Sequence, residues 1–105
     1  MRRGIPNYDE SEVEALIREY HTLRAGLLVD RAGRRVARIA VRLADLDQAL
    51  ARVPDERWRV VLLHGLIGAS QDETARLLSI KQQTVLKRYR KGIEDVVHFI
   101  NGGES

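Results

Sequence analysis

Six basic side chains lie close together near the C-terminal end of the sequence, with no acidic residue among them. They are Arg76, Lys81, Lys87, Arg88, Arg90 and Lys91. Cationic groups at this density attract polyanions such as nucleic acids. The net charge of +3 over 105 residues understates this concentration, because the acidic stretch Asp9–Glu14 offsets it. Since a solvated helix face can carry the same charges, the run is consistent with a polyanion partner without identifying one.

Catalytic and metal-binding chemistry has little support in the sequence. The histidines His21, His64 and His98 are far apart and lack the spacing of metal ligands, and there is no cysteine for a thiolate site. No glycine-rich phosphate loop follows a strand, and the carboxylates form no recognisable acid/base pair. We therefore expect a protein that is not an enzyme and that uses no metal or cofactor.

The chain also lacks the features of exported or membrane proteins. Absence of cysteine is consistent with a reducing compartment. The N-terminal residues contain no apolar core of a signal peptide, and no apolar run approaches the ~20 residues that span a bilayer. These observations predict a soluble, cytoplasmic protein without a membrane partner.

Two apolar stripes predict two amphipathic helices in the first half of the chain. The first helix is expected to end near Leu28, and its start has two possible capping boxes, Ser11 with Glu14 or Asp9 with Glu12. Its stripe consists of Val13, Leu16, Tyr20, Leu23 and Leu27. A break at Asp30–Gly33 precedes the second stripe, although one long helix through it is an alternative. That second stripe consists of Val36, Ile39, Leu43, Leu46, Leu50 and Val53.

Both stripes must be covered, either by folding against each other or by pairing with a second chain. We therefore expect an all-α protein in which residues 1–53 form a helical hairpin or coiled-coil-like segment that mediates oligomerisation, most simply as a homodimer. Tyr8, Tyr20 and Tyr89 are expected to pack rather than to stack on bases, because they occupy stripe or terminal positions. The basic arm Met1–Arg3 and the run Arg31–Arg42 are interpreted as solvated charge.

The sequence predicts three further helices in residues 54–105, which we expect to form a second unit, the DNA-binding domain. Pro54 ends the second helix and starts a third, which Gly68 terminates and whose apolar face is Trp58, Val61, Leu62, Gly65 and Leu66. Ser70 with Glu73 predicts a capping box before a short helix over Gln71–Leu78, with Ala75, Leu77 and Leu78 turned inward. A final helix is expected over Lys81–Ile100, with Val85, Tyr89, Ile93, Val96, Val97 and Ile100 on its apolar face.

The last two helices have the features of a helix-turn-helix. The first helix of that motif needs a small residue where the second crosses it, and the second needs apolar residues inward behind a polar start. Ala75 and Val85 meet these demands, with Leu78 and Ile80 beside the turn. Each residue alone is ordinary core, so the combination carries the prediction.

Residues 53–96 resemble region 4 of bacterial sigma factors, the domain that binds a promoter element, in one register without a gap. Matching positions are Pro54, Val60, Gly68, Ser70, Glu73, Ala75, Leu78, Ile80, Thr84, Val85 and Arg88. The chain departs from that pattern at three positions. Ser79 stands where the family usually has glycine, Lys81 where it usually has serine or threonine, and Trp58 where it often has arginine. Ser79 must then adopt the glycine conformation or the turn opens slightly, and Lys81 cannot cap the last helix, which leaves Ser79 as a substitute cap.

The resemblance implies a DNA-binding face on the last helix. Its base-reading residues would be Gln82, Gln83 and Lys87, whose side chains suit adenine and guanine edges. Its phosphate contacts would be Gln71, Arg76, Lys81, Thr84, Arg88 and Lys91. Leu86 has two interpretations, contact with a thymine methyl group or completion of the core edge, and Arg90 is expected to face solvent.

The chain is too short to hold the other domains of a sigma factor. Its size and order are similar to those of the RinA and ArpU type of phage transcriptional regulators. These resemblances imply a sequence-specific regulator that reads duplex DNA as a homodimer, with RNA polymerase as a further candidate partner. Two other interpretations stay open, a phage terminase small subunit binding packaging-site DNA and an RNA polymerase-binding adaptor without DNA specificity.

Overall fold

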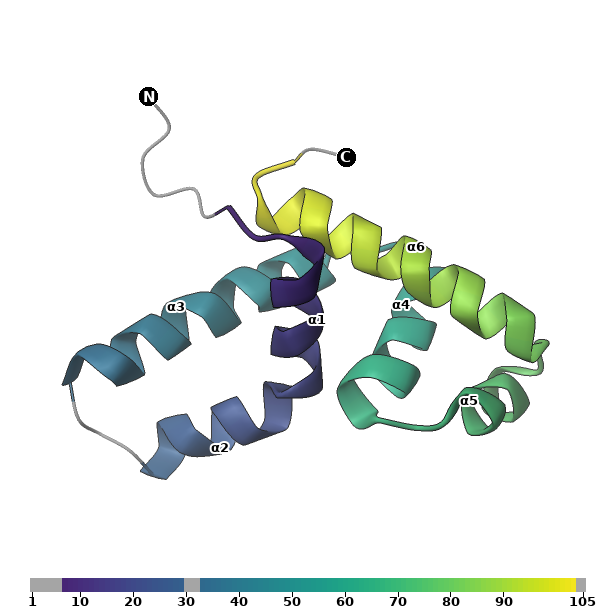
Figure 1. The fold of residues 1–105 in the computed structure, drawn as a ribbon, viewed down its shortest axis with the longest axis horizontal. Coiled ribbons are helices and arrows are strands. Elements are labelled where there is room, and N and C mark those ends of the chain that lie inside the picture. Colours follow the sequence, from purple (N-terminus) through teal and green to yellow (C-terminus); the bar gives the residue numbers. More distant parts are fainter. Residues whose placement is uncertain (1–6, 30–32, 104–105) are drawn as a thin grey trace.

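The computed structural model of the protein describes residues 7–29 and 33–103, with side chains at 7–25 and 38–103. This described part is almost entirely helical and contains no strand. Its elements are α1 (Glu10–Arg18), α2 (Tyr20–Val29), α3 (Gly33–Leu50), α4 (Asp55–Val60), the π-helical segment η1 (Val61–Ile67), α5 (Gln71–Leu78) and α6 (Gln82–Ile100) (Figure 1). The predicted all-α fold class is confirmed.

Helix α1 begins with a capping box formed by Asp9 and Glu12. The Glu12 backbone N–H donates to Asp9 Oδ1 at 2.8 Å, and the Asp9 N–H donates to Glu12 Oε1 at 3.3 Å. These bonds satisfy two backbone donors that the first helical turn leaves without partners. The second of the two predicted capping frames is therefore confirmed. The frame with Ser11 and Glu14 is wrong, because Ser11 already lies inside the helix.

The predicted first helix is divided in two at Glu19, which has φ −96° and ψ 6° and ends α1. Helix α2 then leaves in a different direction (Figure 1). Each half has its own partners, because α1 packs mainly on α6 and η1 whereas α2 packs mainly on α3. The prediction of one continuous helix to Leu28 is therefore wrong. In the stripe, Val13 and Leu16 are buried, Tyr20 and Leu23 are half-buried, and Leu27 lies outside the described side chains.

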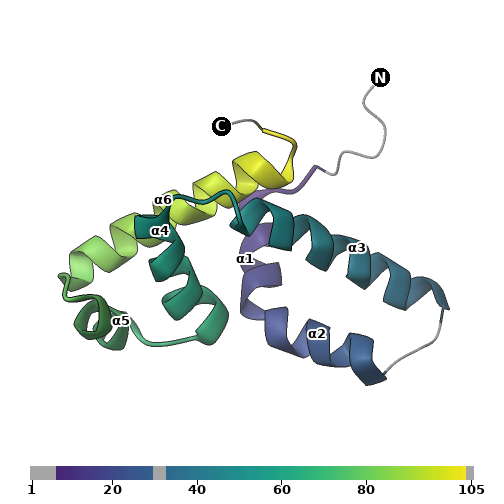
Figure 2. The same cartoon turned by 180° about the vertical axis from the view of Figure 1, so that it is seen from behind.

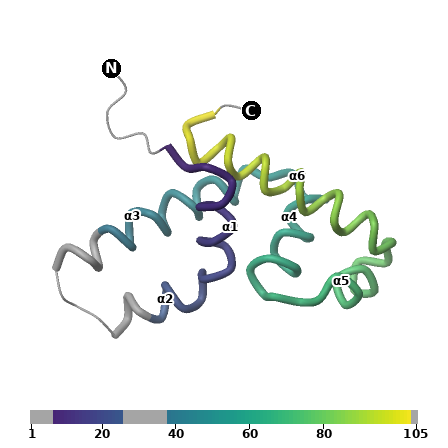
Figure 3. The backbone as a smooth tube through the Cα atoms, in the orientation of Figure 1, coloured from purple at the N-terminus to yellow at the C-terminus, as the bar shows by residue number. Residues whose placement is uncertain are grey.

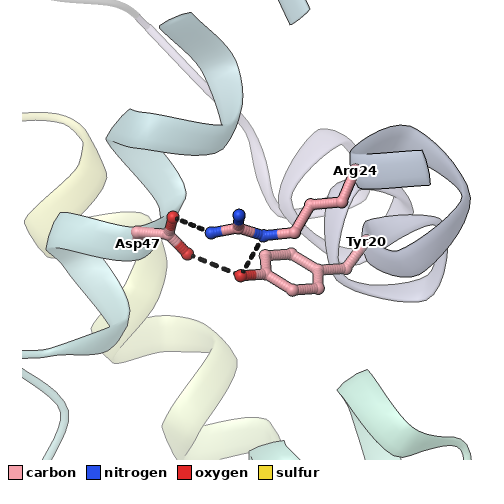
Figure 4. Close-up of polar contacts among 3 residues, drawn as sticks. All are labelled: Tyr20, Arg24 and Asp47. Atoms are coloured by element: carbon pink, nitrogen blue, oxygen red, sulfur yellow. Dashed lines mark hydrogen bonds and ion pairs between the residues drawn. The ribbon is translucent and has the colours of Figure 1, made fainter. Parts of the chain in front are cut away.

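Helices α2 and α3 lie side by side, which one long helix through both could not do (Figure 2). The predicted break at Asp30–Gly33 has its first three residues outside the described part. Asp47 of α3 joins the two helices, because it accepts from the Tyr20 hydroxyl at 2.9 Å and pairs with the Arg24 guanidinium at 2.8 Å (Figure 4). Arg24 Nε also donates to the Tyr20 hydroxyl oxygen at 2.7 Å. Both partners of Asp47 therefore come from α2.

The third predicted helix starts after Pro54 and ends at Gly68, as expected. Gly68 has φ 86° and ψ 19°, a left-handed conformation that glycine adopts without a side-chain penalty. Its second half, η1, is a π-helix rather than an α-helix, which the apolar spacing did not predict. Val61, Gly65 and Leu66 are nevertheless buried, while Trp58 and Leu62 pack partly exposed against the core.

One core joins the two halves of the chain. It contains Val13 and Ile17 of α1, Leu46 of α3, and Ile93 and Val96 of α6, all almost fully buried. Helix α6 is the central element, since it packs against α1, α3, α4, η1 and α5. The segments 1–53 and 54–105 thus share one hydrophobic core, and oligomerisation through the first segment stays a prediction.

Two glycines permit the close packing of helices in this core. A Cβ atom on Gly92 of α6 would overlap the Val61 Cγ2 atom, and one on Gly65 would lie 2.8 Å from Ile17 Cγ2. Both glycines are buried. The backbone of α6 therefore lies directly against the Val61 side chain at the start of η1.

The start of the described chain is tied to the end of α6. The Tyr8 backbone N–H donates to Asn101 Oδ1 at 2.7 Å, and Asn101 Nδ2 donates to the Tyr8 carbonyl oxygen at 2.8 Å. The Tyr8 hydroxyl also donates to Asp45 Oδ2 of α3 at 3.1 Å. Burial of the phenol, together with the Asp45 carboxylate, raises the pKa of Tyr8 to about 12. Tyr8 is therefore a packing residue, as predicted.

Tyr8→Phe should change the way stability depends on alkaline pH. In the unfolded wild-type chain the phenol ionises near pH 10, whereas in the folded protein it ionises near pH 12. The wild-type protein keeps its full Tyr8 contribution below pH 10 and loses it as the pH rises towards 12. The Tyr8→Phe variant has no hydroxyl bond to Asp45, and its stability does not fall through ionisation of a phenol at this position. The stability difference between the two proteins should therefore shrink between pH 10 and pH 12, as measured by urea unfolding; a constant difference would contradict the raised pKa.

Candidate nucleic-acid interface

Helix α5 begins at the predicted capping box. The Glu73 N–H donates to Ser70 Oγ at 3.0 Å, and the Ser70 N–H donates to Glu73 Oε1 at 3.0 Å. The bond from the Ser70 backbone holds the pKa of the Glu73 carboxyl below its usual range, with the Ser70 hydroxyl contributing in the same direction. The predicted range Gln71–Leu78 is confirmed, so the local sequence alone places the first helix of the pair.

Residues 79–81 connect α5 to α6, and Ser79 has φ 56° and ψ 45°. This is the left-handed conformation that the usual glycine would supply, so the first of the two alternatives for Ser79 is confirmed. The turn is closed by the Ile80 N–H, which donates to the Ala75 carbonyl oxygen at 2.9 Å. Lys81 makes no side-chain cap on α6, as expected. Ser79 does not replace it, because its backbone ends α5 two residues before the N-cap position of α6.

Ser79→Gly should stabilise the protein. A left-handed backbone costs a residue with a Cβ atom about 1–2 kcal/mol, and glycine avoids that cost but loses more chain entropy on folding, so we expect a net gain of about 0.5–1 kcal/mol in the free energy of unfolding. Ser79→Ala is the matched control, because it keeps the Cβ atom and should give no gain. Urea unfolding of the three proteins measures the difference. Equal stability of Ser79→Gly and Ser79→Ala would show that the turn is not strained.

A small second cluster lies between α4, α5 and α6. Val60, Ala75 and Val85 are buried in it, and Leu78, Ile80 and Tyr89 pack around them. The predicted inward positions of Ala75, Leu78 and Val85 are confirmed. Leu77 was predicted to face inward, but this is wrong, because its side chain is 67% exposed and Thr74 is buried instead. At 100° per residue, Leu77 lies roughly 100° from the centre of the face formed by Thr74, Ala75 and Leu78.

Of the three predicted base-reading residues, Gln83 and Lys87 have one orientation and Gln82 another. All three side chains are exposed on the first turns of α6. Gln83 and Lys87 are four residues apart and lie opposite the buried face that contains Val85 and Ile93. Gln82 instead turns towards α5, where its Nε2 donates to Asp72 Oδ1 at 3.0 Å. The structure therefore leaves Gln83 and Lys87 as the outward pair.

The predicted phosphate contacts fall into two groups. Lys81, Thr84, Arg88 and Lys91 are spaced three or four residues apart along one side of α6. Lys81 and Lys91 are exposed, although the Lys91 ammonium lies 3.8 Å from Glu94 Oε1, and Thr84 and Arg88 are half-buried. Arg88 shares a surface groove with Asp55, Glu56, Arg59 and Leu78. Sequence spacing gave no signal for these acidic neighbours, because they lie on α4.

Gln71 and Arg76, the predicted contacts from α5, already have partners within the protein. Gln71 Nε2 donates to the Gln82 backbone carbonyl at 3.1 Å, and Arg76 pairs with Asp72 Oδ2 at 2.9 Å. Gln71 is half-buried and thus has a structural role between the two helices. Asp72, which the sequence did not single out, contacts both Arg76 and Gln82.

Three other side chains of α6 that the sequence analysis discussed are either exposed or packed. Leu86 is 41% exposed beside the outward pair, and Arg90 is exposed as expected. Tyr89 packs edge-on against His64, and burial raises the pKa of its phenol.

A mostly buried ion pair between Arg57 and Asp95, at 2.6 Å, holds α4 against the second half of α6. The outward face of α6 is therefore carried on a helix that is fixed from behind.

Within the described part of the chain, no three His, Asp or Glu side chains come together in a way that could hold a metal ion. No helix there has the length and apolar character needed to cross a bilayer. Both statements leave out the basic arm Met1–Arg3; in the Arg31–Arg42 run, the structure describes side chains at residues 38–42.

Comparisons with protein-family models, with curated proteins and with solved structures find no match to this chain. The resemblance to sigma region 4 therefore stays a prediction, and the candidate site is defined by its own geometry. That geometry consists of two helices with a tight connection (Figure 3), an outward Gln–Lys pair and a cationic side of α6.

Proposed function

We propose that this protein is a transcriptional regulator that binds specific sequences of duplex DNA as a homodimer. In this proposal α5, residues 79–81 and α6 form a helix-turn-helix of the sigma region 4 kind, and the first turns of α6 enter the major groove. Gln83 and Lys87 read base edges from the outward face, and Gln82, exposed beside them, reads a neighbouring base edge with the part of its amide that Asp72 leaves free. Lys81, Thr84, Arg88 and Lys91 lie along the phosphates.

The observation that carries the proposal is the position of Gln83 and Lys87. Both are exposed and lie opposite the buried face of α6, with cations beside them. A glutamine amide can bond adenine N6 and N7 together, and lysine can donate to guanine O6 or N7. No acidic residue interrupts the sequence from Arg76 to Lys91, which favours the approach of a polyanion.

The rigid mounting of this face also supports the proposal. Base readout requires side chains held in register on a stable element, and phosphate contacts set that register. The second cluster around Ala75 and Val85, and the Arg57–Asp95 ion pair, hold α6 at two positions along its length. A homodimer, as proposed, predicts a symmetric DNA site with half-sites about 34 Å apart, or a multiple of that distance.

Selection of bound sequences from a random duplex pool tests the proposal, with the mass of the complex measured on the selected duplex. We expect an enriched, symmetric sequence and two protein chains per duplex. Gln83→Ala should relax one base position of that sequence, and Gln48→Ala on α3 is the matched control that should relax none. If Gln83→Ala weakens binding to all sequences equally, the base-reading role is wrong.

The other interpretations of the sequence predict different results in the same experiment. A ring of many subunits on the selected DNA would indicate a terminase small subunit. No enriched sequence from folded protein, together with capture of RNA polymerase, would indicate an adaptor. Either outcome would overturn the proposal of a dimeric, DNA-reading regulator.

A further inference from the structure

Two hydrogen bonds that run in opposite directions join the first turn of α5 to the first turn of α6. The Gln71 side-chain Nε2 donates to the backbone carbonyl oxygen of Gln82 at 3.1 Å, and the Gln82 side-chain Nε2 donates to Asp72 Oδ1 at 3.0 Å. The second oxygen of Asp72 accepts from Arg76 at 2.9 Å. One carboxylate thus contacts both an expected base-reading side chain and an expected phosphate contact.

The bond to Asp72 determines which end of the Gln82 amide faces outward. A carboxylate contains only acceptors, so Gln82 can bond to it only through nitrogen. Its carbonyl oxygen, Oε1, must then point away from Asp72. An unrestrained glutamine can present either its oxygen or its nitrogen, whereas Gln82, an exposed residue, keeps its nitrogen on Asp72 and its Oε1 turned away from that carboxylate.

Resting on the proposed function, we propose that Asp72 is a positioning residue that determines base specificity by orienting Gln82. In the major groove, adenine N6 and cytosine N4 are donors, while guanine O6 and thymine O4 are acceptors. An outward Oε1 therefore favours adenine or cytosine at the position that Gln82 faces and repels guanine and thymine. Asp72 also places a negative charge at the start of α5, which opposes binding to phosphates without regard to sequence.

These two effects give Asp72 a recognisable signature. Its removal should increase affinity for unrelated duplexes while it reduces discrimination at a single base position. A residue that only stabilised the fold would not change these two quantities in opposite directions. A residue that only repelled DNA would leave the base preference intact.

The experiment compares bound-sequence profiles of the full chain at one fixed salt concentration. Gln82→Ala first identifies the base position that Gln82 reads. At that position we expect the wild-type protein to prefer adenine or cytosine by about tenfold. Asp72→Ala should reduce this preference to about twofold and raise affinity for an unrelated duplex by about two- to threefold at low salt.

Two variants separate orientation from charge and from folding. Asp72→Asn has the same shape but can donate as well as accept, so it should let Gln82 turn and should admit guanine or thymine. Glu94→Ala removes an exposed acid from α6 instead; it should strengthen binding to unrelated duplexes and leave the base preference unchanged. Circular dichroism confirms that each variant is folded.

The outcomes distinguish this inference from the proposed function. If the wild-type protein enriches a sequence but Asp72→Ala and Asp72→Asn retain the full preference at the Gln82 position, the positioning role is wrong and the DNA-binding function stands. If the folded wild-type protein enriches no sequence, the proposed function fails, and the specificity role of Asp72 fails with it.

Discussion

Gly92→Val is expected to lower the free energy of unfolding by about 3 kcal/mol, the upper end of the usual cost of overpacking a core. Even a single Cβ atom at this position overlaps Val61 Cγ2. Val61 is fully buried and has a short side chain, so it cannot move aside without displacing η1. Urea unfolding followed by circular dichroism measures the loss.

Two further variants make the cause of that loss specific. Arg90→Val places the same β-branched residue at an exposed position of α6 and should cost well under 1 kcal/mol by helix propensity alone. Val61→Ala in the Gly92→Val background removes the overlapping methyl groups and should restore part of the lost stability. Equal losses in Gly92→Val and Arg90→Val would mean that the two helices do not approach closely at Gly92.

Lys87→Glu is expected to reduce affinity for the selected duplex by about one hundredfold at low salt, because it removes a base contact worth about 1–3 kcal/mol and adds a repulsive charge. The loss should become smaller as salt is raised, since the added repulsion is screened. Titration of a labelled duplex at several salt concentrations measures both effects.

Arg38→Glu is the matched control for charge. It changes the net charge by the same amount at an exposed position of α3, away from the outward face of α6. We expect only a small, salt-sensitive loss of affinity. If Arg38→Glu weakens binding as much as Lys87→Glu does, attraction is general and α6 does not enter the groove as proposed.

Features decided by a few neighbouring residues could be predicted from the sequence. Ser70 with Glu73 predicted the start of α5, and Gly68 predicted the end of η1. The left-handed turn at Ser79 was one of two alternatives that the resemblance to sigma region 4 implied. In each case the physical cause is local: a side chain satisfies a free N–H, or a backbone conformation suits a given residue.

Features decided by contacts between distant segments could not be predicted. Glu19 carries no sequence signal for a break, which arises because α1 and α2 pack against different partners. The π-helical geometry of η1 leaves the same residues buried as an α-helix would, so the apolar spacing did not reveal it. Leu77 was misplaced because Thr74, a polar residue, occupies the buried position.

The candidate site also contains some features that the sequence predicts and others that depend on contacts between distant segments. Exposure of Gln83 and Lys87 follows from the 3.6-residue repeat of α6, which the apolar residues Val85, Tyr89 and Ile93 made visible. The bonds of Gln71, Asp72 and Gln82 depend on how α5 crosses α6, and side-chain types alone do not specify it. The acidic residues beside Arg88 were missed because they lie on α4, and side-chain types alone do not specify how α4 packs against α6.

Folding of this chain should proceed from its local pairs towards the Tyr8–Asn101 link. The two bonded residues are 93 positions apart, so their pairing closes a loop of nearly the whole sequence. The entropic cost of closing a flexible loop rises with its length, whereas α5 and α6 are separated by only three residues. We therefore expect α5 to pair with α6 early and the link to form last, when the helices between its partners have already shortened the path that must be closed.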